Sequence, residues 1–262
     1  MDLSNLNSKS TSLIKLLTTG GLTGLIIIIL MMSAFHIKKS NLRFTCSRYI
    51  LNTYLYVFLS FLIIALSLVS AEHHKFNYVP TTGLFFGLFL LSIGFLVLTM
   101  MVTPNSTSTT IIKHILWLAF ILMLTALFYP LYRSITDNKI IISAIVTTLA
   151  LVLILSAFAF KRPDLISLTW GPILFTLLVT VIIFELVLFL FVPKLRLNNR
   201  SLLSKVMAYV VILLFIFYIL YDTKMMTIRA KACKDNADYI SESLHLFLDI
   251  FNIFIRILSL NR

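Results

Sequence analysis

Charged side chains are scarce in this sequence of 262 residues, because only 12% of them are Asp, Glu, Lys or Arg. Hydrophobic residues make up 60% of the chain, and the mean hydropathy is +1.01. A soluble domain of this length does not need so much apolar material to fill its core. The composition therefore excludes an ordinary soluble protein and predicts an integral, multi-pass membrane protein.

Acidic residues are the scarcer charged group, with ten Asp and Glu against 22 Lys and Arg, which leaves a formal net charge of +12. The basic residues lie between hydrophobic runs, where they meet lipid headgroups or solvent, and aromatic residues do not alternate with them as on a nucleic-acid surface. We therefore expect the lipid bilayer as a partner and no nucleic acid. The basic residues divide evenly between the two predicted sides, so the positive-inside rule leaves the orientation open.

Cysteine is nearly absent, since the chain has only Cys46 and Cys233. Both fall in loops that are predicted on the same side of the membrane. Two cysteines exclude a disulfide framework, and we expect free thiols. Two glycosylation sequons, at Asn105 and Asn199, fall in loops on opposite sides, so at most one side can use them.

Long hydrophobic runs are abundant, and eight of them are long enough to cross about 30 Å of hydrocarbon. They cover residues 16–35, 50–70, 82–103, 114–132, 140–160, 167–192, 203–221 and 239–260. The runs are aliphatic and do not alternate, which favours a helical bundle over a β-barrel. The first run is either an uncleaved helix or a signal peptide, and the missing small-residue cleavage site favours the helix.

The last run, Tyr239 to Leu260, carries polar groups at helical spacing. These groups are Glu242, His245, Asp249, Asn252 and Arg256. At 3.6 residues per turn they share a sector about 80° wide, which we call the polar seam. An ionisable group at membrane depth costs about 3 kcal/mol or more, so the seam must face protein, water or an ion. The other helices should therefore surround this one, while its apolar residues face lipid or other helices.

Two acids stand at matching distances from the loop that joins the last two runs. If these runs form an antiparallel hairpin, Asp222 and Asp249 reach the same depth. The same register brings Arg229 level with Glu242, and we expect an ion pair there. An alternative is that the two acids only fix helix packing, by pairing with Arg256 or Lys224.

Two carboxylates close together in a poorly hydrated bundle cannot easily both ionise. One of them then binds a proton with a raised pKa, and the pair titrates jointly. When deprotonated, the pair presents hard oxygen ligands suited to Ca²⁺. The spacing therefore predicts that Asp222 and Asp249 form a proton sensor that also holds Ca²⁺ transiently.

The remaining polar groups give weaker signals. Glu185 lies within the run 167–192, where it is either part of an ion path or an acid with a partner near a helix end. Glu242 and His245 form one Glu-x-x-His pair, half of a di-iron signature, without a second copy. A zinc hydrolase needs several converging histidines, and only His245 lies clearly inside a predicted helix. We therefore expect no enzyme, no catalytic residue and no cofactor.

Three segments carry a resemblance to a known family: Tyr221-Asp222-Thr223-Lys224, Asp238-Tyr239-Ile240, and the stretch from Leu246 to Phe254. They occur in the order and spacing of the transmembrane Bax inhibitor motif family, meaning Bax inhibitor-1 and its relatives. The chain resembles this family from about Arg48 onward. One departure is Lys224, which stands where the family usually has Gln.

The resemblance implies a seven-helix core over residues 49–262 with the C-terminal helix at its centre. Residues 1–48 then form a polar N-terminus, an extra hydrophobic helix and a basic linker. It also implies a pH-sensitive Ca²⁺ leak channel that lowers stored Ca²⁺ and inhibits cell death, with its sensor on Asp222 and Asp249. In a eukaryotic or viral setting we expect the endoplasmic reticulum or another endomembrane.

An alternative function is a non-conducting interaction protein. Such a protein regulates apoptosis by binding apoptosis-regulating membrane proteins, and the polar seam is then only structural.

Overall fold

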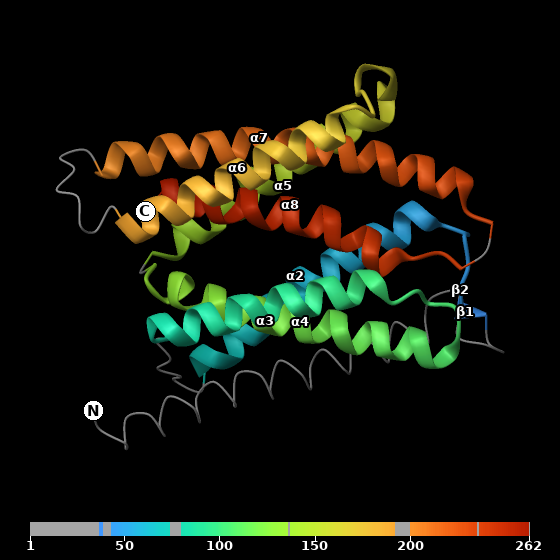
Figure 1. The fold of residues 1–262 in the computed structure, drawn as a ribbon, viewed down its shortest axis with the longest axis horizontal. Coiled ribbons are helices and arrows are strands. Elements are labelled where there is room, and N and C mark those ends of the chain that lie inside the picture. The colour runs from blue at the N-terminus through green and yellow to red at the C-terminus, as the bar shows by residue number, and fades with distance from the viewer. Residues whose placement is uncertain are drawn as a thin grey trace. The chain divides into compact units, whose positions relative to one another are not determined.

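The computed structural model describes residues 37–38, 43–73, 80–135, 137–191, 200–234 and 236–261. These residues form long α-helices, a short antiparallel pair of strands, β1 (Ile37–Lys38) and β2 (Arg43–Phe44), and the 3-10 turn η1 (Pro163–Leu165) (Figure 1). The helices are α2 (Tyr49–His73), α3 (Thr82–Met101), α4 (Thr107–Arg133), α5 (Asn138–Lys161), α6 (Trp170–Phe191), α7 (Arg200–Ala232) and α8 (Tyr239–Leu260).

All seven of these described helices are long and apolar enough to cross a membrane. The prediction of an all-α, multi-pass membrane protein is confirmed. Seven of the eight predicted runs correspond to helices, and their ends agree within about three residues, apart from the start of α4 and the end of α7. The predicted helix at residues 16–35 lies outside the described residues.

The end of α7 differs most from its prediction, because this helix continues eleven residues past the predicted end at Tyr221, to Ala232. Nothing in this stretch breaks a helix, since it contains neither Pro nor Gly. Arg229 and Lys231 occupy the last turn, where positive charge favours the helix dipole. Hydropathy marks where a run leaves the hydrocarbon, whereas the helix itself goes on.

The described residues group into two compact units. The first unit contains α2, α3, α4 and the segment Ala232–Leu244, and the second contains α5, α6, α7 up to Lys231, and residues from His245 onward. The helix α8, red in Figure 1, therefore contributes its first six residues to one unit and the remainder to the other. The predicted division of the chain after residue 48 stays a prediction.

In the first unit, α4 packs against both α2 and α3. A buried polar group on α4, His114, is held by hydrogen bonds on both ring nitrogens. Its Nδ1 lies 2.7 Å from the Thr110 carbonyl, which only accepts, so Nδ1 carries the hydrogen. In the neutral ring, Nε2 then accepts from the Tyr56 hydroxyl at 2.8 Å. The expectation that His245 is the one histidine clearly inside a helix is therefore wrong. A histidine whose two ring nitrogens are both hydrogen-bonded costs little free energy inside a helical bundle.

Lys113, next to His114, is also completely buried. Its Nζ donates to the Val102 carbonyl at 2.5 Å, to Asp238 Oδ2 at 2.7 Å and to Ser241 Oγ at 2.8 Å. The other oxygen of Asp238 accepts from the backbone N–H of Ser241 at 3.1 Å, which caps the start of α8. The Asp238 carboxylate thus caps the start of α8 and also neutralises the buried ammonium group of Lys113 on α4.

A disulfide joins Cys46, three residues before α2, to Cys233, the first residue after α7. The expectation of free thiols is wrong, and the expectation that both cysteines lie on one side of the membrane agrees with the bond. Two cysteines 187 positions apart show no spacing pattern in a sequence. Their pairing depends on the fold, which brings the two Cα atoms to 5.8 Å, within the range that a disulfide spans.

In the second unit, α5, α6, α7 and the turn η1 share a small apolar cluster. It consists of Ala159, Ile166 and Leu220, with Leu155 and Trp170 packed against it. Gly171 opens α6 beside Tyr221, and a Cβ atom at this position would lie 2.5 Å from the tyrosine hydroxyl. The glycine therefore leaves room for the Tyr221 ring against the first turn of α6.

The helix α8 is enclosed by protein, since every residue from Tyr239 to Leu258 is buried or half-buried. Of its most apolar window, 56% is buried, compared with 6% for α6. The apolar side of α8 therefore faces other helices, and Phe247 stacks on Phe251 with ring centroids 5.6 Å apart.

The ion pair of Lys113 and Asp238 yields a stability prediction. We expect Asp238→Asn to cost about 2 to 3 kcal/mol, because it leaves the buried ammonium group of Lys113 without its counter-charge. Lys113→Met should cost less, because the carboxylate that it leaves unpaired is 29% exposed. The double variant should cost less than the sum, since neither charge then remains. Thermal unfolding in detergent measures these values, and Lys139→Met, at an exposed lysine, is the control. Additive costs would show that the pair is not coupled.

Candidate functional site

The two predicted acids come together in the second unit, Asp222 from α7 and Asp249 from α8. Asp222 is half-buried, and Asp249 is 4% exposed. The two carboxyl groups lie within hydrogen-bonding range of each other. They therefore lie at the same depth and face each other, whereas the sequence predicted only the depth.

A hydrogen bond between two carboxyl groups needs a hydrogen atom, and only a protonated carboxyl group can donate one. The arrangement therefore accommodates one shared proton. The second oxygen of Asp249, Oδ2, is buried without a hydrogen-bond partner among the described residues. A buried carboxylate oxygen in this condition is suited to receive a proton, a water molecule or a hard cation.

Tyr218 is a third member of this site that the sequence analysis missed. It lies four residues before Asp222 on α7, so both side chains occupy one face of the helix. Its hydroxyl group interacts electrostatically with both acids. The i, i+4 spacing to a predicted acid is the signal that identifies it. Thr223, beside Asp222, has a buried hydroxyl that lacks a partner among the described residues.

Arg256 of the polar seam pairs with Glu185 of α6. Its Nη2 lies 2.5 Å from Oε1 and donates to Oε2 at 2.7 Å. This ion pair gives Glu185, the acid within α6, a partner of opposite charge. Lys224 donates to the backbone carbonyl of Ile166, near the start of α6. The two cations proposed as packing partners for Asp222 and Asp249 thus have other acceptors.

The rest of the polar seam makes separate contacts. Glu242 is buried and accepts from the Tyr49 hydroxyl at 3.3 Å in the first unit. Asn252 donates to the Leu248 carbonyl within α8 at 2.8 Å, and His245 is half-buried. Arg229, the expected partner of Glu242, is exposed on α7 and belongs to the second unit. That ion pair stays a prediction.

Within the part of the chain that the structure describes, no three His, Cys, Asp or Glu side chains come together as a metal cluster. The zinc hydrolase considered from the sequence needs such a group. The expectations of no enzyme and no cofactor stay predictions.

The comparison with known families decides the family of the chain. The family model described as "Inhibitor of apoptosis-promoting Bax1" matches residues 46–261, which is most of the sequence. The chain belongs to the Bax inhibitor family. It is thus an integral, multi-pass membrane protein of an anti-apoptotic family. No curated protein matches it.

The matched part of this Bax inhibitor family member contains both acids of the candidate site and both disulfide-bonded cysteines. The predicted helix at residues 16–35 lies before it. The roles of the site residues as proton sensor and Ca²⁺ ligands stay predictions, because the match establishes the family and not the chemistry.

The Arg256 and Glu185 pair yields a second prediction. Their side chains are 25% and 33% exposed. We therefore expect a coupling free energy of about 1 kcal/mol between Arg256→Met and Glu185→Gln, below that of a fully buried pair. A double-mutant cycle on thermal unfolding in detergent measures it. Asp137→Asn with Arg162→Gln, both exposed, is the control cycle. Equal coupling in both cycles would contradict a specific ion pair.

Proposed function

We propose that this protein is a non-enzymatic, Ca²⁺-permeable leak channel whose opening depends on the protonation of Asp222 and Asp249. The supporting observation is the close approach of these two carboxyl groups, one of which is almost completely buried. Membership of the Bax inhibitor family supports the same assignment. Ca²⁺ is the transported ion here and not a resident cofactor.

The mechanism rests on competition at one pair of carboxyl groups. With one proton shared, the hydrogen bond holds α7 to α8 at Asp222 and Asp249. Without the proton, two like charges at contact repel each other, and their oxygens become ligands for Ca²⁺. The proton and the cation therefore exclude each other from the pair, and the contact between the two helices changes with its occupancy.

In the cell, such a leak lowers the Ca²⁺ content of an internal store. We propose that this lowering is how the protein inhibits cell death, and that it acts in the endoplasmic reticulum or another endomembrane. Binding to apoptosis-regulating membrane proteins is the alternative route to the same outcome.

The test is Ca²⁺ flux from liposomes that contain the purified protein, measured at several pH values. A single shared proton changes the ratio of protonated to deprotonated pairs about tenfold for each pH unit. We expect the wild-type flux to change with pH through this titration. Asp222→Asn and Asp249→Asn imitate the protonated carboxyl group, so their flux should remain at the acidic wild-type level at every pH.

Asp164→Asn is the matched control, because it makes the same substitution at an exposed aspartate in η1. Its flux should follow the wild-type pH profile. A wild-type profile that persists in both site variants would refute the sensor. Absence of flux from wild-type liposomes would refute conduction and favour the interaction protein, which co-purification of a cell-death regulator in detergent would then test.

A further inference from the structure

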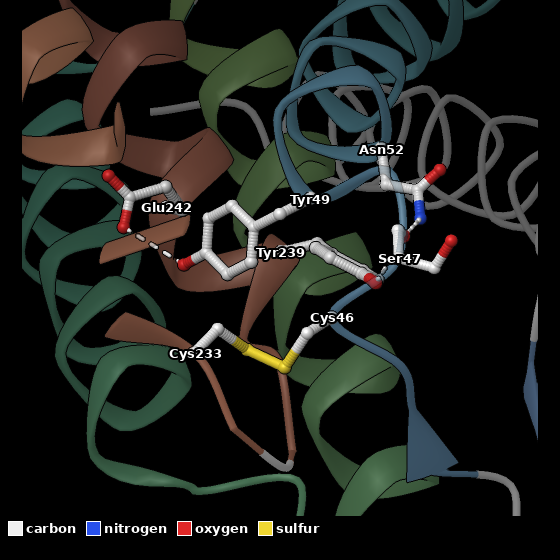
Figure 2. Close-up of a disulfide and its surroundings, with 7 residues drawn as sticks. All are labelled: Cys46, Ser47, Tyr49, Asn52, Cys233, Tyr239 and Glu242. Carbon is white, nitrogen blue, oxygen red and sulfur yellow. Dashed lines mark hydrogen bonds between the residues drawn. A yellow bond between two sulfur atoms is a disulfide. The ribbon is translucent and has the colours of Figure 1, made fainter. Parts of the chain in front are cut away.

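The disulfide lies where the chain enters two helices of the first unit (Figure 2). Cys46 stands just before α2, and Cys233 stands in the loop that leads into α8. Figure 2 shows Tyr49 and Tyr239, the first residues of the two helices, next to the bond. Their rings meet edge to face with centroids 5.4 Å apart. The bond thus joins the starting points of two helices.

Further contacts hold the same place. The Tyr239 hydroxyl donates to the Ser47 carbonyl at 3.3 Å, and the Tyr49 hydroxyl donates to Glu242 at 3.3 Å. Both turns also contain a left-handed residue, Arg48 and Asn236, each with φ of 57°. Asn enters the left-handed region readily, whereas Arg seldom does, so the surroundings of Arg48 hold it in this conformation. The disulfide therefore belongs to a packed, ordered region.

The number of membrane crossings agrees with the bond. Between Cys46 and Cys233 the chain passes through six helices, α2 to α7, each able to span a membrane. An even number of crossings returns the chain to the side from which it started. By the same count, the turn η1 between α5 and α6 lies on the side of the disulfide. The loop between α4 and α5 and the end of α8 lie on the opposite side.

The chemistry of thiols distinguishes these two sides. Glutathione and thioredoxin keep thiols reduced in the cytosol, whereas disulfides persist in the lumen of the secretory pathway and outside the cell. We propose that the side carrying Cys46, Cys233 and η1 faces such an oxidising compartment, where a lasting disulfide fixes the start of α8. The end of α8 then faces the cytosol. This proposal does not depend on Ca²⁺ conduction.

The bond forms by thiol–disulfide exchange with the oxidised form of a thiol–disulfide oxidoreductase of that compartment. The thiolate of one cysteine attacks the disulfide of the oxidant and gives a mixed disulfide. The thiolate of the second cysteine then displaces the oxidant. Two protons leave the two thiols, and two electrons reduce the oxidant to its dithiol.

The first experiment counts thiols in the full chain expressed in eukaryotic cells. Membranes are dissolved in denaturing detergent that contains N-ethylmaleimide, which blocks free thiols. The remaining cysteines are then reduced and labelled with maleimide-polyethylene glycol. We expect two additions to the wild type and none without reductant. Cys46→Ser and Cys233→Ser should each receive none, because the remaining thiol is blocked first. Wild-type protein without additions after reduction would overturn the proposal.

The second experiment determines the orientation with one reporter cysteine on each side, in the chain with its disulfide intact. Asp164→Cys reports on η1 and Ser134→Cys on the loop between α4 and α5, both at exposed positions. A membrane-impermeant maleimide is added to cells whose plasma membrane alone is permeabilised. Ser134→Cys should react at once and Asp164→Cys only after all membranes are dissolved. Where the protein is at the surface of intact cells, the impermeant maleimide added outside should react with Asp164→Cys and not with Ser134→Cys. The reverse pattern would overturn the orientation.

Discussion

A charged side chain inside a membrane needs a partner inside the protein, and this requirement governs how α8 is held. The alternatives are exposure to hydrocarbon, which costs several kcal/mol, or burial without a partner, which costs as much. The helix meets the requirement at three levels: Asp238 pairs with Lys113 at its start, Asp249 with Asp222 in its middle and Arg256 with Glu185 near its end. The apolar residues of the seven helices provide the bundle, and these polar contacts determine which faces meet.

The three contacts differ in what they can do. The first and the third join opposite charges and need no shared proton. The second joins two acids and exists as a hydrogen bond only while one of them holds a proton. The contact in the middle of α8 therefore differs from the contacts at its two ends in requiring a proton. The disulfide at Cys233 adds a covalent attachment at the start of the helix.

Much of this site was predictable because it depends on periodicity. Residues three or four positions apart on a helix share a face in any protein, so the polar seam followed from the sequence. The equal depth of Asp222 and Asp249 also followed, because it needs only two helices and a short loop. Tyr218 obeys the same rule, because it lies four residues before Asp222 on the same face of α7. Lys113 lies just before the run predicted at residues 114–132, although it is completely buried within α4.

By itself the sequence determined the class of protein, the positions of the membrane-spanning helices and the one polar face of α8, because these depend on composition and on spacing along the chain. Only the tertiary structure decided that Asp249 meets Asp222, that Arg256 meets Glu185 and that Cys46 meets Cys233. Each of these contacts joins residues distant in sequence, and its existence depends on how whole helices rotate and pack. Local spacing carries no record of that rotation, because many rotations bury the same apolar residues equally well.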